Sequence, residues 1–184
     1  MTPNTLKDVF MEQIRSLYDI EKQLVQALPK MVKAADSEEL AEGLRSHLVQ
    51  TKEHVLRLDK VFHLCGEKPR AKPCQAIRGL IEESKAGLAD KGPLQDLAII
   101  EAGQTAEHIE MAGYGNARTL AEKLGKADVA ELLEATLKEE KAADEKLTEV
   151  TPGILDGVEG PGVDDAETEE ELEEITAATV LRQD

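Results

Sequence analysis

The chain has 184 residues, a formal net charge of −16, two Phe, two Tyr and no Trp. This size suits one domain with a tail, and the acidity and scarcity of aromatic rings disfavour nucleic acid and anionic membranes as partners. We find neither an apolar run near the ~18 residues of a membrane-spanning helix nor the apolar stretch of a signal peptide. We therefore expect a cytoplasmic protein.

Residues 6–34 are predicted to form the first helix, because apolar side chains recur at the spacing of one helix face. Asp36 followed by Glu39 has the pattern of a capping box that opens a second helix over residues 36–62. The link between them is so short that the two helices must form an antiparallel hairpin.

A long connection follows the second helix. Residues 66–73 contain two prolines, a shorter helix is expected at residues 75–86, and Gly92-Pro93 forms a break. About 30 residues separate the second long helix from the third, enough for a crossover along a bundle, as in ferritin-like topologies. Cys65 and Cys74 flank this connection; we expect reduced thiols, with a bridge between them as the alternative.

The third and fourth long helices are expected at residues 94–124 and 128–150. Gly125 is a candidate C-cap of the third helix and Asp128 a candidate N-cap of the fourth, so these two form a second hairpin. The sequence therefore predicts an all-α protein, in which residues 1–151 form an antiparallel four-helix bundle of two hairpins with a crossover that contains a short helix.

Residues 152–184 form an acidic C-terminal tail with 11 acidic residues and one basic residue. Within it, Leu172, Ile175, Ala178 and Leu181 recur at roughly helical spacing. This segment could be a helix that docks on the bundle or on another subunit, or a solvated, disordered tail.

Three of the long helices place a glutamate in the middle of an apolar face, where a leucine would be expected. These glutamates are Glu21, Glu107 and Glu140, with Glu110 and Asp144 on nearly the same faces. A buried carboxylate costs several kcal/mol unless a positive charge pairs with it. Bundles that hold two iron or two manganese ions use this arrangement, so we expect a metal site.

The depths of these residues along the bundle agree with one shared site. Glu21 lies about 14 residues before the first turn, so its level on the second helix is near Gln50 and Thr51, flanked by His47 and His54. Glu107 and Glu110 lie level with residues 140–144 across the second turn. Carboxylates with imidazole suit iron or manganese better than structural zinc.

Other interpretations remain beside the metal site. The acidic layer could pair with lysines, Arg118 or ordered water, and Glu110 and Asp144 could form flank ion pairs. His54 is either a ligand or a hydrogen-bonded histidine at the core edge. His47 and His108 are expected to be polar flank residues. Tyr114 is expected in the core with its hydroxyl satisfied.

Four segments, in order, also resemble the YciE/YciF family, whose members are stress-associated and have a ferritin-like fold with a di-iron centre. They are DIEKQL at 19–24, CQAIRGLI at 74–81, EHIEMAGYG at 107–115 and EEKAADEKL at 139–147. The resemblance covers about residues 4 to 150. It implies that the metal ligands include Glu21, Glu107, Glu110, Glu140 and Asp144.

The second helix departs from that family. His47-Leu48-Val49-Gln50-Thr51 stands where the family has His-Leu-Glu-Glu-Thr, so a neutral Gln50 replaces a bridging glutamate, and His54 is offered as a further ligand. Gln50 and Tyr114 are expected to be weak or outer ligands. The expected function is oxidation of Fe(II) by oxygen or peroxide at two iron or manganese ions in a homodimer. The alternative is a structural or adaptor bundle with a degenerate or purely structural metal site.

Overall fold

The computed structural model describes residues 4–87 and 91–158. The predicted apolar positions of the acidic tail lie outside these ranges. The described residues form five helices: α1 (Leu6–Ala34), α2 (Glu38–Leu64), α3 (Gln75–Gly87), α4 (Pro93–Lys123) and α5 (Ala127–Leu155). Of these helices, none is both long and apolar enough to cross a lipid bilayer.

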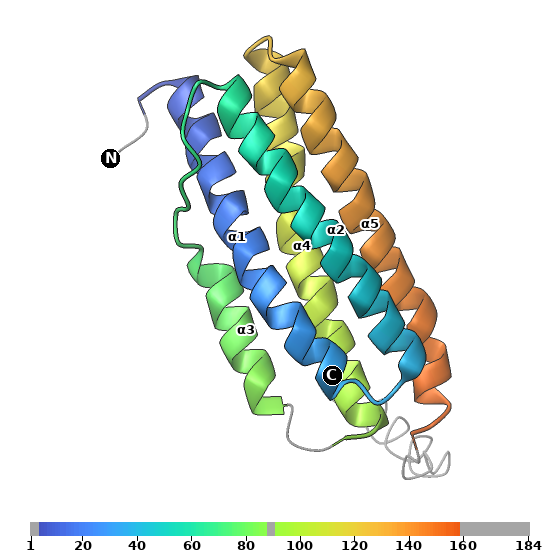
Figure 1. Cartoon of the computed structure of the whole chain (residues 1–184). Coiled ribbons are helices and arrows are strands. Elements are labelled where there is room, and N and C mark those ends of the chain that lie inside the picture. Colours follow the sequence, from blue (N-terminus) through green and yellow to red (C-terminus); the bar gives the residue numbers. More distant parts are fainter. Residues whose placement is uncertain (1–3, 88–90, 159–184) are drawn as a thin grey trace, which may run out of the picture.

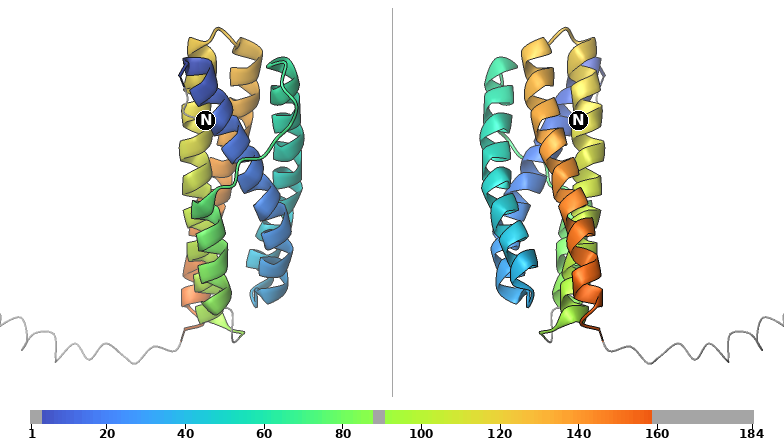
Figure 2. Two further views of the ribbon diagram at one scale, coloured as in Figure 1. Left: turned by 90° about the vertical axis from the view of Figure 1, so that its left-hand side faces the viewer. Right: turned by 90° about the vertical axis from the view of Figure 1, so that its right-hand side faces the viewer.

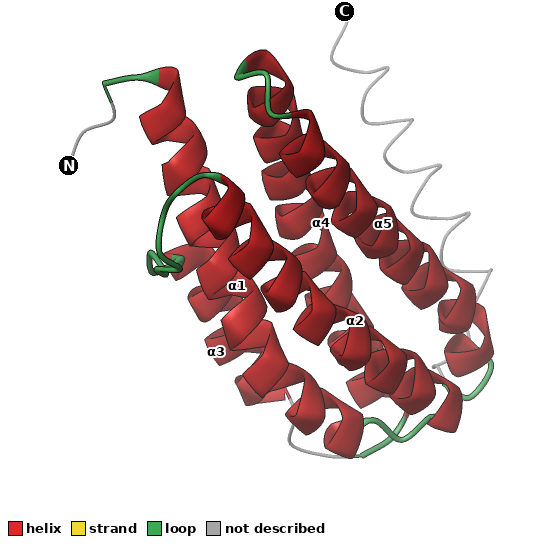
Figure 3. Ribbon diagram, turned by 45° about the horizontal axis from the view of Figure 1, so that its top comes forward, coloured by secondary structure: helices red, strands yellow, loops and turns green. Residues whose placement is uncertain are grey.

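The four long helices form the predicted bundle of two antiparallel hairpins, α1–α2 and α4–α5 (Figure 1; Figure 3). The connection after α2 runs back along α1, where the Lys72 N–H donates to the Arg15 carbonyl at 2.9 Å. The Cys74 N–H donates to Asp19 Oδ2 at 2.7 Å, and α3 then packs beside α1 and α4. This connection is the predicted crossover with its short helix, and both cysteines are free.

The turn between α1 and α2 corrects one predicted cap. The side chain that caps α2 belongs to Ser37, whose oxygen accepts from the Leu40 N–H at 3.3 Å, so the predicted cap at Asp36 is wrong. The backbone N–H groups of Asp36 and Ser37 instead donate to the buried carboxylate of Asp96, each at 2.8 Å. A side chain from α4 therefore holds this turn, and no local pattern could reveal it.

The turn between α4 and α5 confirms the predicted role of Gly125 and corrects that of Asp128. Gly125 has φ +69°, its N–H donates to the Glu122 carbonyl and the Lys126 N–H donates to the Ala121 carbonyl. This is the Schellman arrangement, which favours glycine. Helix α5 begins directly afterwards at Ala127, without a side-chain cap, so Asp128 already lies inside the first turn.

Helix α5 also continues beyond the predicted end near Val150, through Pro152 to Leu155. A proline inside a helix removes one backbone hydrogen bond. The side chains of Val150 and Ile154 are buried in the core, so packing of this last turn offsets that loss.

One end of the bundle, beside the α4–α5 turn, has a continuous apolar core, which we call the packed end. Phe62 packs edge-on against Tyr18, with ring centroids 5.4 Å apart. In the side views of Figure 2, α1 lies beside α4 at this end and diverges from it toward the α1–α2 turn. The residues of the packed end are Phe10, Ile14, Leu17, Leu58, Val61, Phe62, Ala117, Ala121, Val129 and Leu133.

Candidate metal centre

Four glutamate side chains lie together in the middle of the bundle, although each has the charge that normally keeps a residue at the surface. Glu21 comes from α1, Glu107 and Glu110 from α4, and Glu140 from α5, and none is more than 3% exposed. Helical periodicity places each on the inner face of its helix, surrounded by leucine, isoleucine and alanine. Burial without compensation would cost several kcal/mol for each carboxylate.

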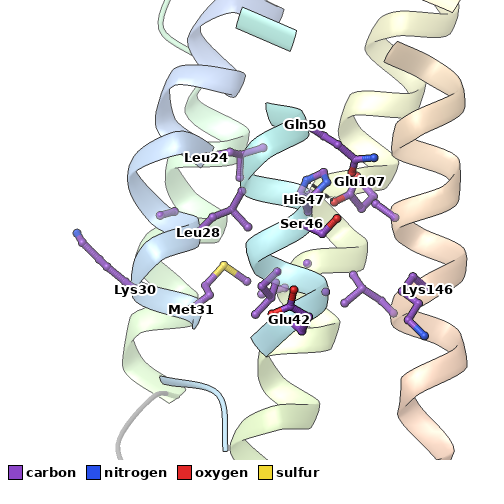
Figure 4. Close-up of a pocket in the computed structure, with 18 of the residues that line it drawn as sticks. Leu24, Leu28, Lys30, Met31, Glu42, Ser46, His47, Gln50, Glu107 and Lys146 are labelled. Atoms are coloured by element: carbon purple, nitrogen blue, oxygen red, sulfur yellow. Dashed lines mark ion pairs between the residues drawn. The ribbon is translucent and has the colours of Figure 1, made fainter. Parts of the chain in front are cut away.

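Two histidines of α2, two helical turns apart, face these glutamates. The Nε2 atom of His47 lies 3.0 Å from Glu107 Oε1, and Figure 4 shows the two side chains in contact. The Nδ1 atom of His54 lies 3.0 Å from Glu140 Oε1 and 3.4 Å from Glu21 Oε1. All four long helices therefore contribute to one polar layer.

The side chains form two groups that could each hold a metal ion. In both groups, one donor atom per residue lies within 4.8 Å of every other. Glu140 belongs to both groups, as a carboxylate shared by two ions would. The first group contains His47, Glu107, Glu110 and Glu140, and the second contains Glu21, His54 and Glu140.

Many of the carboxylate oxygens in this layer have no hydrogen-bond partner among the described residues. These atoms are Glu21 Oε2, Glu107 Oε2, Glu140 Oε2 and both carboxylate oxygens of Glu110, whereas Glu140 Oε1 faces only the His54 ring. Native interiors contain only a few such atoms, and each requires an explanation. Oxygen atoms with imidazole nitrogens are the donor set that suits Fe(II) or Mn(II), so the residues present fit a pair of such ions.

The pKa values of these side chains also indicate that the negative charges of the buried carboxylates are not compensated. Burial, together with the charges of Glu21, Glu140 and Glu107, raises the pKa of Glu110 well above its ordinary value. Burial also raises the pKa of Glu140 to about 7, against the lowering effect of His54. Burial alone would lower the pKa of His54, but Glu140 and Glu21 raise it to about 10. Protons on Glu110, Glu140 and His54 can therefore stand in for a metal's charge.

An outer layer of side chains holds His54 in place. Its Nε2 atom lies 2.8 Å from Glu139 Oε2, which leaves Nδ1 directed at Glu140 and Glu21. Arg57 binds both oxygens of Glu139 and donates to Thr136 Oγ1 at 3.2 Å. A carboxylate behind a histidine fixes the orientation and tautomer of the ring, which is common around metal ligands.

Tyr114 is fully buried, and its hydroxyl donates a short hydrogen bond to Glu21 Oε1. The tyrosine was expected to be a core residue with a satisfied hydroxyl or an outer ligand, and this contact places it directly behind the glutamate. Because its hydroxyl occupies one lone pair of Glu21 Oε1, Tyr114 fixes the rotamer of that side chain.

The structure brings together five of the predicted site residues: Glu21, His54, Glu107, Glu110 and Glu140. Asp144 lies outside both groups. Its Oδ1 atom accepts from Gln104 at 3.3 Å and lies 3.5 Å from His108 Nε2, so it forms the flank contact that was its alternative interpretation. Gln50 is half-buried, and Figure 4 shows its side chain beside those of His47 and Glu107.

His47 corrects the sequence analysis, which placed it on the flank of α2. Its ring is only 8% exposed and lies within the first group. The signal was present in its spacing, because His47 and His54 are seven residues apart and therefore share one helix face. No such signal was present in the sequence for Glu139 and Arg57, which hold His54 in place. Their contact joins two helices, so spacing along one helix does not predict it.

The comparisons with known proteins agree with this architecture. Residues 5–157 match the family described as "Domain of unknown function (DUF892)". Protein YciF of Escherichia coli (strain K12) is 40% identical over 153 residues, which are 82% of this chain and 92% of YciF.

Comparison with solved structures shows the same similarity to YciF and its relatives. The crystal structure of the E. coli stress protein YciF has a TM-score of 0.81 at 38% identity, and the match covers 85% of this chain and all of that one. YcfI of Rhodopseudomonas palustris has a TM-score of 0.76 at 41% identity over 79% and 94% of the two chains. Because the family match and these relatives span most of the chain, the protein belongs to the DUF892 family, together with YciF.

Proposed function

We propose that this protein is a ferritin-like stress protein that binds two Fe(II) or Mn(II) ions in its buried layer and oxidises Fe(II) with oxygen or peroxide. E. coli YciF is described as a stress protein, and it resembles this chain over most of its length. We further propose that the protein acts as a homodimer in the cytoplasm.

The observation that supports metal binding most strongly is the set of buried carboxylate oxygens without partners in the described part of the chain. Two divalent cations would offset the charges of the four glutamates and occupy their free lone pairs. Glu140 lies in both groups and would be shared. His47 and His54 would supply nitrogen ligands from α2. On this helix the neutral Gln50 stands in place of a glutamate ligand.

The bound metal would carry the electron transfer, so no side chain must act as a specialised acid or base. The residues of this chain have positioning roles. Tyr114 holds Glu21, Glu139 holds His54, and the apolar core of the packed end closes the layer on one side. Such support behind the ligands keeps them in one geometry before metal arrives.

An oxygen-free titration with Fe(II) tests the proposal. The wild type should bind about two Fe(II) per chain and, on exposure to air or peroxide, develop a ferric absorbance. Glu107→Gln should bind less iron, whereas Glu101→Gln, an exposed glutamate on the same helix, should behave like the wild type. Absence of stoichiometric iron in the wild type would refute metal binding, and bound iron that air and peroxide leave unchanged would refute oxidation.

A second candidate is a structural bundle with no catalytic metal. YcfI of R. palustris is described as a suspected structural protein. In this chain, His54 contacts Glu21, Glu140 and Glu139, so an imidazolium could compensate part of the charge without metal. Thermal unfolding separates the two functions: a bound metal raises the midpoint and a chelator removes that gain, whereas a metal-free bundle responds to neither.

A further inference from the structure

A cavity of about 700 Å³ lies in the half of the bundle toward the α1–α2 turn, and all five helices contribute to its wall. Protein interiors contain few voids larger than a water molecule. Sites for small molecules occupy ~300–1,000 Å³. The cavity opens to solvent, so it is a cleft and not an enclosed void, and it has the volume of a ligand site.

Most of the wall is apolar or made of small side chains. Leu24 and Leu28 of α1 face the cavity from one side, and Figure 4 shows them opposite His47 of α2. Gly103 and Ala106 of α4 also line it, and the glycine leaves room for Leu147, whose Cδ1 would lie 2.9 Å from a Cβ atom at position 103. An apolar wall of this kind favours a molecule that is mainly hydrocarbon or aromatic.

One end of the cavity is polar and touches the candidate metal centre. His47 and Glu107 line it, together with Gln50, and Figure 4 shows these three side chains side by side. His47 Nδ1 and Glu107 Oε2 are buried and have no hydrogen-bond partner among the described residues. Because these two atoms expose almost no surface, the polar group that a ligand meets at this end is the half-buried amide of Gln50, beside the His47 ring.

The mouth carries charges of both signs. Exposed Lys30 and Lys146 line it beside exposed Glu38, Glu39 and Glu42, and Lys146 Nζ lies 3.1 Å from Glu39 Oε1. This mixture does not select for a strongly charged ligand of either sign.

We propose that the cavity binds an uncharged, mainly apolar organic molecule with one hydrogen-bonding end, which reaches His47 and Gln50 beside the carboxylate layer. Binding itself does not require metal. The placement of such a molecule next to metal ions, as a substrate or effector of the centre, rests on the proposed function.

Two glycines allow a matched test. Gly43 of α2 lines the cavity and Gly79 of α3 does not, and a Cβ atom at either position would meet no atom within 4 Å. Gly43→Leu should therefore fill the cavity while the helix forms normally, and Gly79→Leu makes the same change outside it. The probe is N-phenyl-1-naphthylamine, an uncharged fluorescent molecule, titrated with chelator present and again after Fe(II) loading.

We expect saturable binding of about one probe per chain to the wild type and Gly79→Leu, at least tenfold weaker in Gly43→Leu, with the same iron content in all three. The proposal fails if the wild type shows no saturable binding or if Gly43→Leu binds the probe equally well. It also fails if Gly43→Leu alone changes the sedimentation mass, because the cavity would then be an interface between two copies. Loss of iron binding with retained probe binding would refute the metal centre and leave this site standing.

Discussion

The packed end and the opposite half of the bundle are built from the same helices but are filled in opposite ways. At the packed end, large apolar side chains such as Ile14 and Phe62 are completely buried. The other half contains a layer of buried glutamates and, next to it, a cavity of about 700 Å³. The contrast indicates that packing at the packed end contributes most of the unfolding free energy. The candidate metal centre and the cavity lower it, as functional sites commonly do.

The largest expected effect compares one substitution in the two halves. Leu58→Ala, at the packed end, should lose ~3–5 kcal/mol of unfolding free energy, because it leaves a void among tightly packed neighbours. Leu24→Ala should lose ~2 kcal/mol or less, because its side chain already borders the cavity. Urea unfolding measures both losses of free energy. Equal losses would show that the two halves of the bundle are equally well packed.

The second prediction reverses the usual sign of a core mutation. Glu110→Leu should stabilise the metal-free protein by ~1–3 kcal/mol, since both carboxylate oxygens lack partners among the described residues. Urea unfolding in chelator measures the gain. Glu101→Leu, at an exposed position of α4, is the control and should stay within ~0.5 kcal/mol of the wild type. A destabilised Glu110→Leu protein would show that the glutamate makes a favourable contact in the metal-free state.

The third prediction concerns the support behind His54. Glu139→Gln should weaken Fe(II) binding ~10–100-fold, because a carboxylate that orients a metal-binding histidine contributes about this much. Glu134→Gln is a matched control, since Glu134 is equally half-buried on α5 and pairs with Arg118 at 3.0 Å. Calorimetric titration measures the affinity.

Nitrogen chemical shifts of His54 test the same role independently of iron. In the metal-free protein, Glu139→Gln should change the protonation pattern of the His54 ring, and Glu134→Gln should not. An unaltered ring in Glu139→Gln would show that Glu139 acts only through its ion pair with Arg57.

The last prediction concerns the pH dependence of stability. The folded-state pKa of Glu140, about 7, lies above its ordinary 4.5, and that of His54, about 10, lies above 6.5. A group whose pKa is higher in the folded than in the unfolded state stabilises the folded protein at low pH. That contribution disappears as the pH rises through the folded-state pKa. In chelator, the melting temperature should fall by ~2–4 °C for each kcal/mol lost as the pH rises from 5 to 10.

With metal, the pH trend should weaken or reverse. Bound ions require deprotonated ligands, so metal binding strengthens as the pH rises. Melting scans with and without Fe(II) should therefore diverge at high pH. Parallel curves at every pH would show that Glu140 and His54 are not the groups that bind metal.

Local sequence patterns were sufficient to predict the helices, the two hairpins and the placement of four glutamates and His54 on inner faces. These follow from local rules, because a period of 3.6 residues assigns each side chain to a face and the length of a link determines which helices are neighbours. The turn at Gly125 was equally local, since only backbone geometry decides it.

The other features depend on contacts between residues that are distant in the chain, and local patterns do not predict such contacts. Asp144 follows Glu140 by four residues, so periodicity puts it near the same face, but Gln104 and His108 bind it at the flank. Asp96 of α4 binds the backbone of the α1–α2 turn, where Asp36 was expected to cap α2. The cavity depends on how α1 diverges from α4, and helix divergence arises from packing of whole surfaces.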